Sequence, residues 1–89
     1  MNEPREELLK FPTDYPIKVV GRSDAQLRAR IDAVVLRHAP DTTAERISER
    51  ASGAGNFVSI TYVIIARSKP QIVALVEELA SSEGVVMVI

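Results

Sequence analysis

The fold is decided by the ten residues from Phe57 to Ala66, which read FVSITYVIIA. β-Branched and aromatic side chains dominate this stretch, and they favour the pleated, half-buried surface of a strand. Strand side chains alternate between two faces, so packing Ile60, Tyr62 and Ile64 beneath helices sends their neighbours to the other face. The stretch therefore predicts a central strand in a sheet with one covered and one open face.

A first helix is predicted before this strand. Its apolar stripe recurs at helical spacing and consists of Leu27, Ile31, Val34 and Val35. The preceding segment, Ser23 to Gln26, has the pattern of a capping box. Pro40 is expected to stop the helix at about His38, because proline cannot continue it.

A second helix is predicted after the strand. Ser68-Lys69-Pro70-Gln71 is a second capping box with a proline in the first turn. The apolar stripe behind it consists of Ile72, Leu75, Val76 and Leu79. Gly84 closes this helix, and Val85 to Ile89 predicts a last strand.

Two further strands complete the pattern. Ile17 to Val20 alternates like a strand that Gly21 ends, and Pro12 and Pro16 are expected to prevent a regular element before it. Thr42 to Ser52 is charged and alternates weakly, which suits an edge strand. The Gly-Ala-Gly-Asn sequence at positions 53–56 indicates a turn, since glycine and asparagine tolerate positive φ.

The element order is therefore β-α-β-β-α-β. Two split βαβ units with right-handed crossovers predict an α+β, ferredoxin-like sandwich, with a four-stranded antiparallel sheet and both helices on one face. The first and third strands should be central, and the second and fourth should lie at the edges. We expect residues 1–13 to form a polar lead-in and residues 14–89 a single domain, because 89 residues supply one core.

Composition narrows the possible functions. The 46% hydrophobic and 26% charged residues are typical of an ordinary soluble globule. The absence of cysteine excludes disulfides, iron–sulfur clusters, thiolate nucleophiles and cysteine zinc sites. The net charge of −1 argues against nucleic acid or anionic membrane as a partner. The first residues lack an apolar signal core and no apolar run reaches about 20 residues, so a cytoplasmic location is expected.

His38 is the only histidine in the chain. At a helix C-terminus its cationic form would favour the negative end of the helix dipole. Catalysis would need a partner, and Asp41 is the only nearby candidate. A metal would find only scattered carboxylates beside one histidine. We therefore predict a helix-capping role for His38, and no catalytic residue, metal site or cofactor.

A possible anion or ligand loop is formed by Gly21, Arg22 and Ser23, which join a central strand to the first helix. Free amides, the helix dipole and a guanidinium could converge there on an anion. Acylphosphatases use the same fold and a loop in this region, but their glycine-rich signature and placed asparagine are missing. An ordinary helix start with a solvated arginine is the favoured interpretation.

RNA binding is the other hypothesis that this topology raises. RNA-recognition motifs stack bases on two aromatic side chains placed two residues apart on the third strand. Phe57 could serve as one platform, but Ser59 occupies the second position and Tyr62 has the opposite parity. Nucleic acid binding is therefore not expected.

The open sheet face is the most informative predicted surface. Alternation assigns to it Lys18, Val20, Thr61, Val63, Ile65, Val86 and Val88, and assigns to the covered face Ile17, Val19, Val85, Met87 and Ile89. The aliphatic members of the first set would form one apolar patch, which often marks a contact site. Alternatively, Leu8, Leu9 and Phe11 could fold back and cover part of it.

Motifs along nearly the whole chain resemble the YbeD-like family of small bacterial proteins of unknown function. They are Leu9 to Pro12, Tyr15 to Val19 with Gly21, Arg37 to Pro40, Ser52 to Phe57 with Ser59, Glu77 to Leu79, and Val85 to Ile89. The resemblance implies a ferredoxin-like fold similar to ACT regulatory domains and a connection to lipoate metabolism, and it brings no established activity or ligand. The chain is slightly longer than the family pattern around positions 43–48, which leaves the register of the second strand open.

Three functions remain open. The first is a non-enzymatic binding or regulatory module that contacts a second copy or another protein. The second is a small-molecule sensor similar to ACT domains, although the acidic and glycine-containing loop of their amino-acid-binding members is absent after the first strand. The third is an acylphosphatase-type hydrolase that depends on Arg22.

Overall fold

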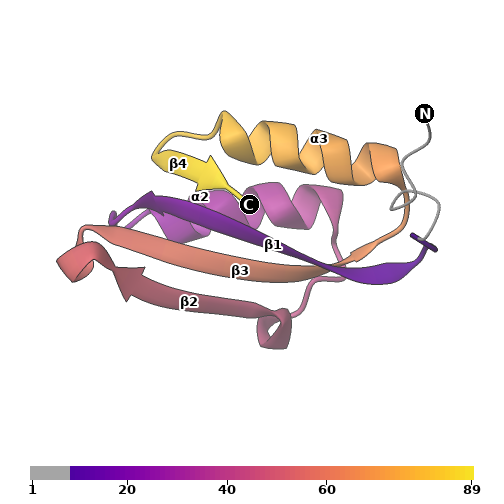
Figure 1. Cartoon of the computed structure of the whole chain (residues 1–89), viewed down its shortest axis with the longest axis horizontal. Helices are drawn as coiled ribbons and strands as arrows, with labels where there is room; N and C mark the ends of the chain where they lie inside the picture. The colour runs from indigo at the N-terminus through magenta and orange to yellow at the C-terminus, as the bar shows by residue number, and fades with distance from the viewer. Residues whose placement is uncertain (1–8) are drawn as a thin grey trace.

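The computed structural model describes residues 9–89 and shows two helices packed on one face of a four-stranded sheet (Figure 1). The elements are β1 (Thr13–Arg22), α2 (Leu27–His38), β2 (Ile47–Ser52), β3 (Phe57–Ala66), α3 (Lys69–Ala80) and β4 (Val85–Val88). All neighbouring strands are antiparallel, and their order is β2-β3-β1-β4. The predicted ferredoxin-like order, with β1 and β3 at the centre, is confirmed.

The core lies between β3, β1 and the two helices. Along β3 every second residue is buried, and Ile60, Tyr62 and Ile64 expose none of their surface. All four residues of the predicted apolar stripe of α2 are buried. The stripe of α3 is also buried, except that Val76 is only partly buried where it packs against the core. The predicted parity of β3 is therefore confirmed.

The start of α2 differs from the predicted capping box. The side chain of Ser23 does not cap the helix; instead the carboxylate of Asp24 accepts a hydrogen bond from the Gln26 amide at 2.9 Å. The same carboxylate binds Arg30 at 3.2 Å. A charged acceptor makes stronger hydrogen bonds than a hydroxyl, which explains why Asp24 takes this position.

The predicted box at α3 is half formed. Ser68 Oγ accepts a hydrogen bond from the Gln71 amide at 3.2 Å. The Gln71 side chain turns elsewhere, because its Oε1 accepts from the Arg67 amide at 2.6 Å and its Nε2 donates to the His38 carbonyl at 2.8 Å. Gln71 thereby ties the start of α3 to the end of α2.

Strand β1 is longer than predicted, because it passes through Pro16 and continues beyond Gly21. β4 stops pairing where Lys18 and Ile89 exchange two backbone hydrogen bonds. Pro16 lies two residues before Lys18, so its nitrogen, which carries no hydrogen, faces the same side of β1 as β4 does. On that side no strand of residues 9–89 pairs with β1 at this point, and proline is tolerated at such an edge. The prediction that Pro16 prevents a strand is wrong.

Gly21 does not end the strand but permits a close approach. A Cβ atom there would lie 2.7 Å from Leu27 Cδ2 and 2.9 Å from the Gly84 carbonyl oxygen. Side chains cannot occupy such a space without displacing their neighbours. Gly21 therefore lets β1 lie against α2 and the turn before β4.

The register of β4 corrects the predicted open face. Val88 pairs with Val19 and Met87 pairs with Val20, and a bulge at Val86 then shifts the register. Cross-strand partners share a face, so Val88 packs against the core, whereas Met87 and Ile89 face outward; all three are the reverse of the prediction. The last five residues are all apolar, so their sequence contains no alternation from which parity could be predicted.

The segment of uncertain register before β2 is a short 3₁₀ turn, Ala44–Arg46. β2 itself covers only the second half of the predicted strand, and it pairs with β3 from Ile47 opposite Tyr62 to Ser52 opposite Phe57. The turn between β2 and β3 is confirmed, with Gly53, Ala54 and Gly55 all at positive φ.

Candidate functional site

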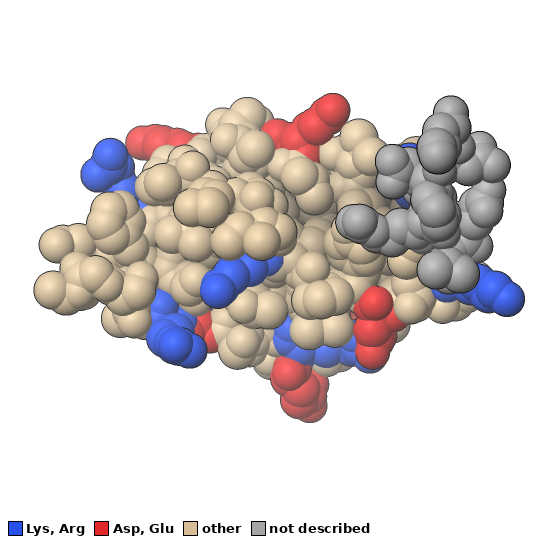
Figure 2. All heavy atoms as spheres, in the orientation of Figure 1, with Lys and Arg blue, Asp and Glu red and all other residues tan. Residues whose placement is uncertain are grey.

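The open face of the sheet contains an apolar area, which we call the apolar strip. It consists of Pro16, Val20, Val63, Ile65, Met87 and Ile89. Cross-strand pairing joins Val63 to Pro16 and Val20 to Met87, and Ile89 lies opposite Lys18. Met87 and Ile89 expose 48% and 68% of their surface. In Figure 1 α2 lies behind β1, so Figure 2, which has the same orientation, shows the open face. Uncharged residues cover most of this view, and acidic side chains lie mainly near its outline (Figure 2).

Several predicted surface residues lie where alternation placed them. Lys18, Thr61 and Val63 are on the open face, as the pairing of Lys18 with Thr61 and of Pro16 with Val63 shows. Val86 is exposed at the bulge, and Met87 takes the outward position predicted for Val88.

Beside the apolar strip, the same face holds a polar pocket of about 540 Å³. We call it the polar pocket, and its lining consists of Lys18, Ser48, Glu49, Arg50, Ser52, Ser59 and Thr61. Sequence reasoning named Lys18 and Thr61 but missed Arg50, because the register of β2 was unknown. The signal that could have found it is the turn at positions 53–56: with the turn located, counting back along β2 puts Arg50 opposite Ser59.

Three cations of the open face have no partner among the described residues. Lys18, Arg22 and Arg50 make no side-chain hydrogen bond or ion pair within residues 9–89. In contrast, five other arginines bind carboxylates, and these are Arg28, Arg30, Arg37, Arg46 and Arg67. The open face is therefore a local concentration of unneutralised positive charge in a chain of net charge −1.

The covered side holds a polar chain that starts at Tyr62. Its hydroxyl donates to Asp32 at 2.6 Å, and Arg28 binds both Asp32 and Glu49 at 2.8 Å. Burial, together with the hydrogen bond to Asp32, raises the pKa of Tyr62 far above its ordinary value, so the phenol stays protonated as a donor. This chain of contacts ties β2 and β3 to α2.

The predicted anion loop is not assembled as an anion site. The Arg22 amide donates to the Gly84 carbonyl at 2.9 Å, and the Ser23 amide donates to the Asn56 carbonyl at 3.0 Å. The carboxylate of Asp24 already occupies the start of α2, and its hydrogen bond from the Gln26 amide holds its pKa below the ordinary value. Of the three loop residues, Arg22 alone contributes to the open face, where it lies opposite Phe57.

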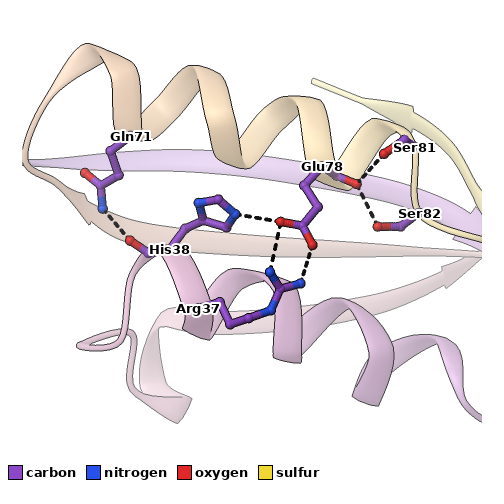
Figure 3. Close-up of polar contacts among 6 residues, drawn as sticks. All are labelled: Arg37, His38, Gln71, Glu78, Ser81 and Ser82. Atoms are coloured by element: carbon purple, nitrogen blue, oxygen red, sulfur yellow. Dashed lines mark hydrogen bonds and ion pairs between the residues drawn. The ribbon is translucent and has the colours of Figure 1, made fainter.

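His38 lies at the end of α2, where the sequence placed it, but its partner is Glu78 of α3 rather than Asp41 (Figure 3). His38 Nε2 lies 2.7 Å from Glu78 Oε1, and Arg37 binds both oxygens of the same carboxylate. The Arg37 guanidinium, and after it His38, lower the pKa of Glu78 to about 2. The cluster therefore clamps the two helices together.

The clamp contains no arrangement for nucleophilic catalysis. The hydroxyls of Ser81 and Ser82 donate to the backbone carbonyl of Glu78 rather than to the imidazole (Figure 3). Asp41 pairs with Arg67 instead of orienting His38. Such catalysis requires a nucleophile that is hydrogen-bonded to a base, and a third group that orients the base. Here the serine hydroxyls and the Asp41 carboxylate are bonded to other partners.

Within residues 9–89, no cluster of three or more histidine and carboxylate side chains is placed to hold a metal ion. Neither α2 nor α3 is long and apolar enough to cross a membrane. Of the three residues that the alternative interpretation folds back over the open face, Leu8 lies outside the described residues, Leu9 is half-buried, and Phe11 is exposed.

Comparison with known proteins places these features in a family. A family model described as "Protein of unknown function (DUF493)" matches residues 6–89. A UPF0250 protein of Janthinobacterium sp. (strain Marseille) is 39% identical over 79 residues, which cover 89% of this chain and 87% of the relative. A UPF0250 protein of Shewanella sp. (strain ANA-3) is 40% identical over 85 residues, which cover 96% and 94%. The predicted family resemblance is confirmed.

Solved structures support the fold. The ACT domain from GTP pyrophosphokinase of Chlorobium tepidum superposes with a TM-score of 0.68 at 22% identity, over 86% of this chain and 97% of that chain. The C-terminal domain of the MgtC protein from Mycobacterium tuberculosis gives a TM-score of 0.63 at 20% identity, over 92% and 89%. At these identities the likeness shows the fold alone, and the expected similarity to ACT domains is confirmed at that level.

Proposed function

Because this chain belongs to the DUF493 family of proteins of unknown function, we propose a function from its geometry: it is a non-catalytic binding module that contacts a second protein through the apolar strip. The observation that carries this proposal is the exposure of Met87 and Ile89, 48% and 68%, at the edge of a face that the helices leave open. Contiguous apolar surface of this kind is typical of contact sites.

The strip supplies the hydrophobic part of such a contact. Its side chains extend across β3, β1 and β4, from Ile65 and Val63 to Met87. Burial of apolar surface stabilises an interface by roughly 25 cal/mol per Å² before the cost of association is subtracted. A partner that covers the whole strip therefore gains more than one that touches a single side chain.

The charges beside the strip favour a partner of complementary chemistry. Lys18 lies opposite Ile89, and Arg22 and Arg50 lie on the same face, all without ion-pair partners in the described part of the chain. Two copies placed face to face would bring these cations together, which costs free energy. We therefore propose a partner surface with apolar side chains flanked by carboxylates.

The proposed link to lipoate metabolism rests on the YbeD-like resemblance and enters the choice of partners. Proteins of that metabolism are the first candidates to test. A partner from elsewhere would leave the contact proposal intact and remove the lipoate link.

The test is a quantitative binding comparison of two aspartate variants. Met87→Asp places a charge in the strip, and Val73→Asp places the same charge on α3 at a side chain of nearly equal exposure, 44% against 48%. Cross-linking in the native cell extract, followed by titration of the purified captured protein, should show binding that Met87→Asp reduces at least about tenfold. Val73→Asp should bind like the wild type.

Three results would count against the proposal. Equal binding by both variants would exclude the strip, and a captured surface without apolar and acidic side chains would contradict the stated partner chemistry. Concentration-dependent dimerisation, measured by sedimentation and abolished only by Met87→Asp, would replace the second protein by a second copy.

A further inference from the structure

We propose that the polar pocket binds a small polyanion, whose phosphate or carboxylate groups neutralise Lys18 and Arg50 of its lining. The pocket ligand goes beyond the proposed protein contact: it would bind the cations beside the apolar strip, which also favour an acidic rim on the protein partner, and it would leave the strip itself to that partner. The binding would make the open face a surface with two occupants, a protein on the apolar strip and a small ligand beside it.

The charge distribution is the first argument. Lys18 and Arg50 of the lining are unpaired within residues 9–89. In contrast, Glu49, the only acidic residue of the lining, directs its carboxylate to Arg28 of α2 at 2.8 Å. Asp14, at the far end of β1, is bound to Arg46 at 3.0 Å. The nearby carboxylates are therefore engaged, and the positive potential of the pocket is left for an external anion.

The strand register is the second argument, because it centres the cations on Ser59. Ser59 lies opposite Arg50 on β2 and opposite Val20 on β1. Lys18 and Arg22 are two residues either side of Val20, so both are diagonal neighbours of Ser59. Diagonal neighbours in an antiparallel sheet are about 7–8 Å apart, a distance that long basic side chains span. Lys18 and Arg50, which both line the pocket, are therefore neighbours of Ser59 from opposite sides, and Arg22 follows on the same face of β1.

The donor chemistry of the pocket suits oxyanions. Ser48, Ser59 and Thr61 supply hydroxyl groups, and Arg50 supplies a planar guanidinium that binds phosphate or carboxylate through two hydrogen bonds. A single small ion would meet only part of this donor set. A compound with two or more anionic groups can bind Lys18 and Arg50 together.

The size of the pocket points to a metabolite-sized ligand. Its volume of about 540 Å³ falls within the range of about 300–1,000 Å³ that is usual for small-molecule sites. A nucleic acid strand is disfavoured, because Ser59 stands where a second stacking aromatic would be required beside Phe57.

The test titrates the full chain with inorganic pyrophosphate and, separately, with citrate, at fixed ionic strength. Two-dimensional ¹H–¹⁵N NMR should show saturable shifts at the amides of Ser48, Arg50, Ser59 and Thr61 with at least one of the two. Acetate, a monoanion, should give no saturation. A response to pyrophosphate alone assigns a phosphate ligand, and a response to citrate alone assigns a carboxylate ligand.

Charge-matched variants decide whether the pocket is responsible. Arg50→Gln and Lys18→Gln should each weaken binding about tenfold, since each removes a charge-assisted contact. Lys10→Gln removes the same charge at a residue that precedes β1, whereas Arg22 lies at the opposite end of that strand. This variant should leave the affinity for the polyanion unchanged. Met87→Asp tests the protein contact separately, because it leaves every pocket residue in place.

The inference is overturned if neither polyanion saturates, or if Lys10→Gln weakens binding as much as Arg50→Gln does. Binding only to a polyuridylate control and to neither small polyanion would assign the cations to nucleic acid instead. Loss of polyanion binding in Arg50→Gln with intact protein binding would separate this site from the apolar strip.

Discussion

The two faces of this sheet use their polar side chains in opposite ways. On the covered side, Tyr62 donates to Asp32, which Arg28 also binds, and no buried side-chain nitrogen or oxygen of residues 9–89 lacks a partner. On the open face, Lys18 and Arg50 have no partner in the described part of the chain. Polar groups of the covered side hold elements together, whereas Lys18 and Arg50 of the open face join no elements within residues 9–89.

The largest expected difference between the faces comes from two adjacent residues of β3. Ile60 is completely buried, whereas Thr61 points to the polar pocket. Ile60→Ala should lower the free energy of unfolding by about 2–5 kcal/mol, because it leaves a cavity in the core. Thr61→Ala should change it by no more than about 0.5 kcal/mol. Urea unfolding of the two variants measures both values.

A similar loss in both variants would break the comparison, since it would mean that Thr61 is packed as tightly as the core. A loss confined to Ile60→Ala would establish that the open face can be altered without unfolding the domain. This result is also the stability control for the proposed binding experiments.

The next largest effect is expected at Gly21, where β1 meets α2. Gly21→Ala introduces a Cβ atom 2.9 Å from the Gly84 carbonyl oxygen and 2.7 Å from Leu27 Cδ2. The leucine can rotate but the backbone carbonyl must move, so we expect a loss of about 1–3 kcal/mol. Thermal unfolding followed by circular dichroism measures it. A stability equal to that of the wild type would show that the close approach is not required.

Most of the fold could be predicted because its signals are local. Helical spacing located both helices, and the parity of β3 follows from the polar residues Ser59 and Thr61 that interrupt an apolar run. The parity of β4 could not be predicted, because Val85 to Ile89 contains no polar residue and the bulge is set by pairing with β1. The strand through Pro16 could not be predicted for a related reason, since the effect of its missing N–H donor depends on how far β4 extends along β1.

The candidate site was predictable only in part. Alternation along one strand placed Lys18 on the open face, but Arg50 required the pairing of β2 with β3. An anion loop at Gly21 to Ser23 was only the less favoured interpretation of the sequence, and the amides of Arg22 and Ser23, on which it depends, are bonded to Gly84 and Asn56. Residues that come together across strands cannot be inferred until the register is known.

A smaller effect sharpens the comparison of charges. Arg28 binds Asp32 and Glu49, whereas Arg50 binds no carboxylate in residues 9–89. Arg28→Gln should lower the free energy of unfolding by about 0.5–1 kcal/mol, a modest value because the side chain is 39% exposed. Arg50→Gln should leave it unchanged or raise it slightly, because it relieves repulsion from Lys18. Destabilisation by Arg50→Gln equal to that by Arg28→Gln would mean that the pocket cation is structural.

The smallest expected effect concerns the clamp between the helices and appears as a dependence on pH. Arg37 and His38 lower the pKa of Glu78 to about 2 from an ordinary value of 4.5. A carboxyl group whose pKa is lowered on folding stabilises the protein fully above its unfolded pKa. That stabilisation is lost as the pH falls from about 4.5 towards 2, because the unfolded chain takes up the proton first.

Glu78→Gln removes this titration, and Glu77→Gln makes the same change at a neighbouring side chain with no hydrogen bond or ion pair in residues 9–89. Urea unfolding at neutral pH should show Glu78→Gln less stable than the wild type, and the difference should shrink steadily as the pH is lowered to about 2. Glu77→Gln should differ from the wild type by an amount that changes little over the same range. If the difference in stability between Glu78→Gln and the wild type stays constant with pH, the carboxylate contributes through packing rather than through its charge. The contrast between paired charges on the helix side and free charges on the open face would then have no electrostatic basis on the helix side.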